Sequence, residues 1–128
     1  MSDETKLAFS NYQNALFSLD IGIKNAIDDL GKDGVIQRFE FTFELMWKFF
    51  KIYLFEDGVN CNSPRDCLSK AFKYGLIHNE QIFLDMLADR NSSTHIYSRE
   101  ESEAIYSRIK NDYLYELKKI HKEYEVRI

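Results

Sequence analysis

The chain has 128 residues, of which 45% are hydrophobic and 15% aromatic, and its formal net charge is −4. This length and composition exclude a disordered chain and fit one domain with a sizeable core. The negative charge excludes a protein that coats nucleic acid nonspecifically, because such binding relies on many Lys and Arg contacts to phosphate. With five Gly, one Pro and no sustained polar–apolar alternation, the sequence predicts a single all-α domain over residues 1–128.

Two long helices are predicted first. Apolar residues at steps of three and four indicate a helix from about Asp3 to Leu30, whose buried face holds Tyr12, Leu16, Leu19, Ile23, Ile27 and Leu30. A turn at residues 31–34 should follow, because its two glycines permit a left-handed helix stop. The second helix, Val35 to Phe55, is apolar on more than one side, so it is central or shares a face with another subunit. We expect a homodimer.

Trp47 and the phenylalanines of the second helix recur at helical spacing. This spacing favours a role in the core over one in stacking on nucleic-acid bases.

Capping residues predict where three further helices begin. Ser63 followed by Pro64 favours the start of a short third helix. Asn79 is a candidate cap for a fourth, and Ser98 with Glu101 forms a capping box that opens a long fifth helix. The expected architecture is therefore an up-and-down helical bundle of about five helices.

The cysteines, the N-terminus and the hydropathy pattern restrict metal binding and location. Cys61 and Cys67 have no second Cys pair, so they match neither a zinc site nor a disulfide framework, and we expect reduced thiols. No His, Cys and acid grouping has metal-ligand spacing, so neither a metal nor another cofactor is expected. The sequence lacks a signal pattern at its start and a run of roughly 18 apolar residues. We expect no membrane association and a cytoplasmic location.

Residues 90–97, RNSSTHIY, contain the candidate site. Arg90 can hold two phosphate oxygens with its planar fork of donors, and His95 can exchange a proton near neutral pH. Residues five apart on an unbroken helix point away from each other. The hydroxyl residues 92–94 compete for backbone hydrogen bonds and therefore favour a helix end between the two. We expect Arg90 on the last helical turn, His95 folded back beside it, and Tyr97 on the same rim.

A purely structural interpretation of these residues is also open. Arg90 can pair with Asp89 or Asp85 near the end of its helix, while the histidine forms a hydrogen bond within a turn. Glu44 lies four residues before Lys48, a spacing that favours a helix-face ion pair over a catalytic or metal-binding carboxylate. A chance match of Arg and His at this separation is common enough that spacing alone does not decide between these interpretations.

Three segments in the same order resemble the nucleotidyltransferase substrate-binding protein family of the HEPN superfamily: residues 37–48 (QRFEFTFELMWK), residues 63–66 (SPRD) and residues 89–97 (DRNSSTHIY). The resemblance covers nearly the whole chain. It implies an all-helical homodimer and a minimal nucleotidyltransferase partner encoded nearby. In HEPN toxins, Arg and His separated by four to six residues form the ribonuclease site, which implies catalytic roles for Arg90 and His95 and substrate binding by Asn91. In HepT-like members, a Tyr two residues after the His is adenylylated by the partner, which implies the same modification of Tyr97.

The chemistry of RNA agrees with this implication. RNA carries its own nucleophile, the 2′-hydroxyl, so a metal-free site needs only a proton acceptor, a proton donor and a cation. One His cannot serve both faces of an in-line displacement, so two subunits should share one cleft. We expect the fourth helix and the connector after it to form the dimer face, with help from the second helix. We therefore expect a metal-independent endoribonuclease, the toxin of a toxin–antitoxin pair. The alternative is a noncatalytic subunit that presents a substrate or nucleotide to a nucleotidyltransferase.

Overall fold

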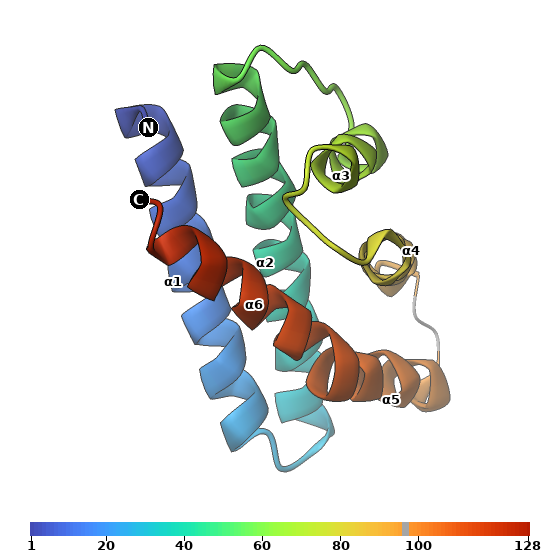
Figure 1. Ribbon diagram of the computed structural model, residues 1–128. Coiled ribbons are helices and arrows are strands. Elements are labelled where there is room, and N and C mark those ends of the chain that lie inside the picture. The colour runs from blue at the N-terminus through green and yellow to red at the C-terminus, as the bar shows by residue number, and fades with distance from the viewer. Residues whose placement is uncertain (96–97) are drawn as a thin grey trace.

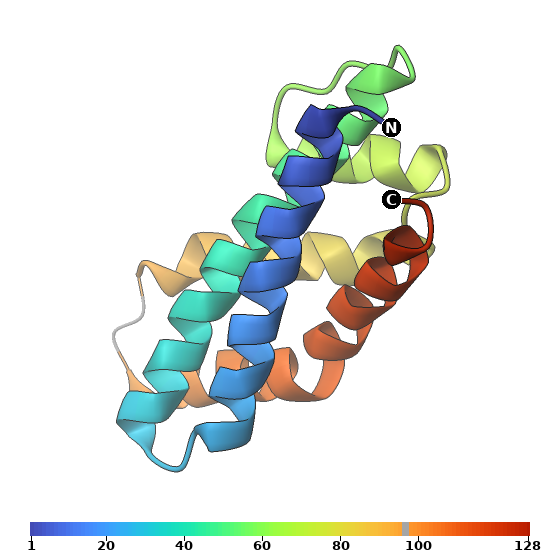
Figure 2. The same cartoon turned by 90° about the vertical axis from the view of Figure 1, so that its left-hand side faces the viewer.

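The computed structural model describes residues 1–95 and 98–128, and it confirms the all-α prediction (Figure 1). Two long helices, α1 (Asp3–Asn25) and α2 (Asp29–Glu56), pack side by side along most of their length. The shorter helices α3 (Pro64–Lys73) and α4 (Glu80–Ser93) lie beside α2. The predicted fifth helix is α5 (Arg99–Arg108), a π-helical turn η1 (Ile109–Tyr113) and α6 (Leu114–Glu125) in succession. In Figure 2, α4 crosses behind α1 and α2, and α6 lies to the side of α1.

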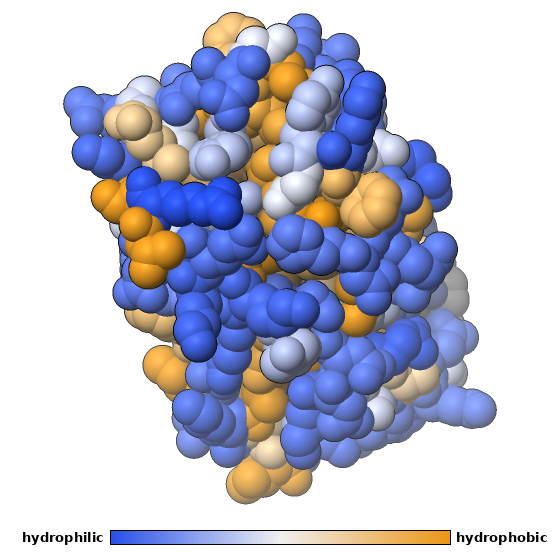
Figure 3. Space-filling view, viewed as in Figure 1, coloured by the Kyte–Doolittle hydropathy of each residue, from blue (hydrophilic) through white to orange (hydrophobic). Residues whose placement is uncertain are grey.

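The turn between α1 and α2 differs from the prediction. We expected it at residues 31–34, but these residues lie in the first turns of α2, and residues 26–28 connect the helices instead. Asp28 is extended and its carboxylate accepts a hydrogen bond from the Gly31 N–H at 2.8 Å, so Asp28 caps α2. The earlier turn leaves exposed two residues that were expected in the core: Ile27 and Leu30. Figure 3 shows hydrophobic atoms at the lower end of an otherwise mostly hydrophilic face, where this turn lies.

The predicted starts of α3, α4 and α5 are confirmed. Ser63, Asn79 and Ser98 are extended, and each side chain accepts a hydrogen bond from the backbone N–H three residues later, at 3.2, 3.4 and 3.1 Å. Each bond satisfies a helix N–H that has no partner within the helix. After α3 the chain reverses through Gly75, whose φ of +82° is a conformation that glycine adopts without strain. The caps and the turn at Gly75 set where α4 begins, and α4 carries the candidate site.

Aromatic rings are the largest fully buried side chains of the core. Seven fully buried rings come from α1, α2, α4 and α6: Tyr12, Phe39, Phe43, Phe49, Phe50, Phe83 and Tyr124. Burying a ring such as Phe stabilises the fold by roughly 2–3 kcal/mol. Tyr12 also donates a hydrogen bond from its hydroxyl to the Leu117 carbonyl at 2.6 Å, which joins α1 to α6. None of the helices formed by the described residues has the length and apolar character needed to cross a bilayer.

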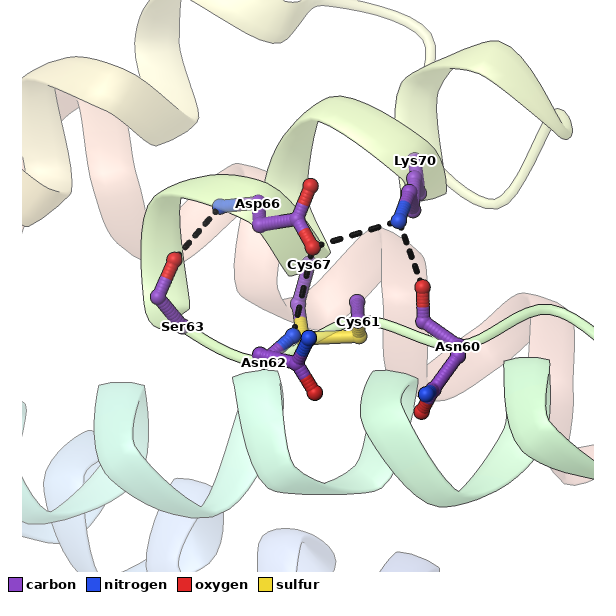
Figure 4. The surroundings of a disulfide bond; sticks show 7 residues. All are labelled: Asn60, Cys61, Asn62, Ser63, Asp66, Cys67 and Lys70. Atoms are coloured by element: carbon purple, nitrogen blue, oxygen red, sulfur yellow. Dashed lines mark hydrogen bonds and ion pairs between the residues drawn. A yellow bond between two sulfur atoms is a disulfide. The ribbon is translucent and has the colours of Figure 1, made fainter.

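The prediction of reduced thiols is wrong. Cys61 and Cys67 form a disulfide, and both are fully buried (Figure 4). The physical reason is local: Pro64 starts α3 so soon after Cys61 that the first helical turn brings Cys67 back beside it, with 5.1 Å between the Cα atoms. Asp66 accepts a hydrogen bond from Lys70 Nζ at 3.2 Å and fixes this turn further. The disulfide joins the α2–α3 connection to the first turn of α3.

Candidate active site

The chain leaves α4 through the three hydroxyl residues that were predicted to break it. The side chains of Ser92, Ser93 and Thr94 each donate a hydrogen bond to the carbonyl three residues earlier, at 3.2, 2.8 and 3.4 Å. These bonds compete with continued helix formation, and α4 ends at Ser93 with Thr94 as its C-cap. Arg90 is therefore on the last turn of α4, and His95 lies on the turn that follows, where its N–H donates to the Ser92 carbonyl at 2.9 Å. The expected break is confirmed.

Arg90 pairs with an acid on another helix. Its Nη2 donates to Glu44 Oε2 of α2 at 2.7 Å, and its Nη1 donates to Asn91 Oδ1 at 3.1 Å. Glu44 also accepts from Trp47 Nε1 at 3.0 Å and forms an ion pair with Lys48 at 3.4 Å. The structural interpretation that paired Arg90 with an acid of its own helix is thus wrong, whereas the predicted Glu44–Lys48 pair is confirmed. The ion pair with Glu44 holds the Arg90 guanidinium in one orientation. The sequence analysis did not predict this pair.

The environment of Glu44 predicts a pH-dependent contribution to stability. Burial raises the pKa of this carboxyl, but the Trp47 N–H and the charges of Arg90 and Lys48 outweigh burial, so its pKa lies below the ordinary value of 4.5. A carboxyl with a lowered folded-state pKa stabilises the fold above its unfolded-state pKa and loses that effect as the pH falls through the folded-state value. In urea unfolding, the native protein should be more stable than Glu44→Gln at neutral pH, and this difference should shrink below about pH 4.5. A difference independent of pH would contradict the prediction.

Arg90 and Asn91 border a surface hollow of about 700 Å³ between α2 and α4. The side chains that line it are Gln37, Glu40, Phe41, Glu44, Arg90, Asn91 and Thr94. His95 follows Thr94 directly and is exposed, but it is not among the lining residues. Tyr97, the predicted site of modification, lies outside the described residues. Two of the predicted site residues, Arg90 and Asn91, therefore line the hollow. His95 lies on the turn that follows α4.

A buried acid fixes α4 directly behind Arg90. Asp89, 9% exposed, accepts two hydrogen bonds from the Arg108 guanidinium, at 2.7 Å from Nε and 2.8 Å from Nη2. The Tyr113 hydroxyl donates to the same carboxylate. Burial first, and then the hydrogen bond to Asp89, raise the pKa of Tyr113 well above its ordinary value, so the phenol keeps its proton and remains a donor. Arg108 ends α5 and Tyr113 ends the π-helical turn η1, so this network joins α4 to α5 and to η1.

The described side chains of the site include no group of metal ligands. Within residues 1–95 and 98–128, no three His, Cys, Asp or Glu side chains are arranged so that they could hold a metal ion. The positive charge beside the Glu44 carboxylate comes from Arg90, which bonds to it directly. The described side chains thus offer a fixed guanidinium, an amide and a nearby imidazole, which suit phosphate binding and proton transfer.

A family model described as "Nucleotidyltransferase substrate binding protein like" matches residues 7–126. The chain belongs to this family. The resemblance of the three sequence segments is thereby confirmed. A relative from Haemophilus influenzae (strain ATCC 51907 / DSM 11121 / KW20 / Rd), called "Probable ribonuclease HepT", is 34% identical over 74 residues. That match covers 54% of this chain and 51% of the relative, so the chain spans about half the length of the curated relative.

Two solved structures of similar proteins share the fold of this family member. A protein from Thermus thermophilus superposes with a TM-score of 0.81 at 29% identity, over 88% of this chain and 97% of that one. A second, from Haemophilus influenzae, has a TM-score of 0.68 at 25% identity, over 94% of this chain and 96% of that one. The latter was described as revealing the fold of a substrate binding domain of a nucleotidyltransferase.

Proposed function

We propose that this family member is a metal-independent endoribonuclease of the HEPN type, the toxin of a two-gene system whose antitoxin is a nucleotidyltransferase. The observation that carries the proposal is the placement of Arg90. Its guanidinium is held by Glu44 at the edge of the 700 Å³ hollow, and the helix break that follows puts His95 on the adjoining exposed turn. The similarity to a relative called a probable ribonuclease supports the same activity.

The proposed reaction uses the nucleophile that RNA supplies. His95 accepts the proton of the 2′-hydroxyl, whose oxygen attacks the adjacent phosphorus, and the bond to the 5′-oxygen breaks. Arg90 stabilises the additional negative charge of the phosphorane, and Asn91 binds a phosphate or sugar oxygen. The leaving 5′-oxygen takes a proton from the His95 of a second subunit. The products are a 2′,3′-cyclic phosphate and a 5′-hydroxyl.

A homodimer supplies the second imidazole in this scheme. We propose that α4 and the connector after it form the shared face, with help from the part of α2 around Glu44, because Arg90 and His95 lie there at the surface. Two copies of Arg90 would then concentrate positive charge in a cleft of a protein whose net charge is −4. We place the reaction in the cytoplasm, where RNA substrates are present.

The nucleotidyltransferase partner provides a means of inhibition. In the proposed step the Tyr97 oxygen attacks the α-phosphorus of ATP, the phenol loses its proton, and pyrophosphate leaves. The resulting adenylyl group is a bulky anion close to His95 in the sequence, so it would repel RNA phosphate and block the cleft. Mass spectrometry of the chain expressed with its partner should detect an adenylyl group on Tyr97; an unmodified Tyr97 in protein that the partner has neutralised would contradict this step.

Cleavage in the presence of a chelator tests the ribonuclease proposal directly. Purified protein is mixed with an end-labelled single-stranded RNA and an excess of EDTA, and the products are separated on a denaturing gel. We expect fragments that end in a 2′,3′-cyclic phosphate, because the mechanism requires no metal. RNA that stays intact at protein concentrations in which the dimer is populated would contradict the proposal.

A second candidate function uses the same hollow: a noncatalytic subunit that binds a nucleotide or another substrate for a nucleotidyltransferase. The similarity to a structure described as a substrate binding domain favours it. In that case Arg90 binds a phosphate group without cleavage. Isothermal titration with ATP and with AMP separates the two functions, because a binding subunit should take up nucleotide yet leave RNA intact in EDTA.

A further inference from the structure

A second hollow adjoins the one that contains Arg90. It lies between α1 and α2, has a volume of about 670 Å³, and shares Gln37 and Phe41 with the first. Phe41 stands between the two hollows and is 61% exposed, although most phenylalanines of α2 are buried. An exposed ring flanked by two open hollows has both space and apolar surface for a planar ligand.

Side-chain amides surround this ring. Asn11 and Asn14 of α1 and Gln37 of α2 line the second hollow. In the part of the chain that the structure describes, none of these three side chains takes part in a hydrogen bond. Each amide offers two N–H donors and an oxygen acceptor. This combination suits the edge of a nucleobase, which also presents donors and acceptors in one plane.

Guanidinium groups lie on both sides of the ring. Arg90 lines the first hollow and Arg38 lines the second. Arg38 donates one hydrogen bond, from Nη1 to the Ser18 carbonyl at 2.8 Å, and a guanidinium has further donors for a phosphate. Arg38 and Phe41 are three residues apart on α2, a rise of about 4.5 Å. A strand could therefore place one phosphate near each cation with a base between them.

The charge of the first hollow limits what binds there. Glu40 and Glu44 contribute two negative charges and Arg90 one positive charge, so the side chains that line it carry a net charge of −1. Such a hollow accommodates one phosphate on Arg90 together with an uncharged base, but it disfavours a chain of adjacent phosphates. A single strand of RNA meets this condition, because each phosphate is separated from the next by a nucleoside.

We propose that the surface around Phe41 is a base-binding subsite for single-stranded RNA, next to the phosphate bound at Arg90. One unpaired base stacks on Phe41, the three amides bond to its edge, and Arg38 holds the next phosphate. This inference rests on the proposed ribonuclease function, and it assigns the substrate as unpaired rather than double-stranded RNA. The three amides around Phe41 suit the edge of a base, and the two guanidinium groups that flank the ring suit phosphates, so this surface matches a strand of RNA.

Fluorescence anisotropy with a labelled single-stranded RNA tests the subsite. A His95→Ala background is used so that binding is measured without cleavage. Phe41→Ala in that background should weaken binding about 5- to 160-fold, the loss that removal of one base–aromatic stack produces. Phe41→Trp should keep or improve the affinity. The matched control is Phe55→Ala, because Phe55 lies on the same helix and is 68% exposed but lines neither of the two hollows; it should bind RNA like the background.

The outcomes separate this inference from the ribonuclease proposal. If the native protein leaves RNA intact but binding still depends on Phe41, the ribonuclease proposal fails and the subsite stands. If the native protein cleaves RNA and Phe41→Ala binds it as tightly as the background, the subsite is wrong and the ribonuclease proposal stands. Equal binding of double-stranded and single-stranded RNA would also overturn it. Light scattering gives a further test of the subsite. If Phe41→Ala changes the protein from dimer to monomer, the ring belongs to a protein interface and the subsite proposal is wrong.

Discussion

Replacing His95 with alanine is expected to lower the rate of RNA cleavage by about 10²- to 10⁴-fold, the range over which a positioned acid–base group accelerates proton transfer. RNA affinity should change little, because the imidazole contributes its proton transfer in the transition state rather than a phosphate contact in the ground state. Single-turnover cleavage with saturating enzyme measures the chemical step, and anisotropy measures affinity on the same RNA. The side chain is exposed and at a turn, so stability should be unchanged.

Two further variants make this result specific. His78→Ala removes another exposed histidine, which lies near Glu123 at 3.7 Å and outside the hollow, and it should cleave RNA like the native protein. Arg90→Lys keeps the charge but loses the fork that bonds to Glu44 and Asn91, so it should lose most of the cleavage rate and some affinity. A His95→Ala protein that cleaves at the native rate would remove the imidazole from the mechanism.

The largest expected effect on stability comes from Asp89. Asp89→Ala leaves the Arg108 guanidinium and the Tyr113 hydroxyl without their shared acceptor. Removing one partner of a buried charged pair costs roughly 3–5 kcal/mol. The Arg108 side chain is 42% exposed and can still be hydrated, so we expect a loss at the lower end of this range, about 3 kcal/mol. That loss is a large fraction of the roughly 5–15 kcal/mol that stabilises a typical domain. Urea unfolding followed by circular dichroism measures it.

The control for Asp89 is one turn away on the same helix. Asp85 is exposed and accepts one hydrogen bond, from Gln81 at 2.9 Å, so Asp85→Ala should change the free energy of unfolding by less than about 0.5 kcal/mol. Asp89→Asn keeps the size of the side chain and should lose less stability than Asp89→Ala. Because Asp89 adjoins Arg90, we expect both Asp89 variants to weaken RNA cleavage as the end of α4 loosens. Equal stability of the two alanine variants would show that the buried network contributes nothing.

The sequence predicts features of this fold that depend on neighbouring residues. The caps Ser63, Asn79 and Ser98 act on amides three residues away, so their effect is readable without knowledge of the fold. The same is true of the hydroxyls of residues 92–94, which end α4 as predicted. The turn after α1 was predicted at the two glycines of residues 31–34, but it lies at residues 26–28, where the Asp28 side chain caps α2 through its bond to the Gly31 N–H.

What the sequence by itself determined is the helical content, the starts of α3 to α5, the break between Arg90 and His95, and the family to which the chain belongs. Only the tertiary structure decided which acid holds Arg90, which groups surround Asp89, and that Phe41 stays exposed between two hollows. The reason is the range of the interactions. Caps and helix periodicity act within one or two turns, whereas the pairing of Glu44 with Arg90 joins residues 46 positions apart and depends on how α4 packs against α2.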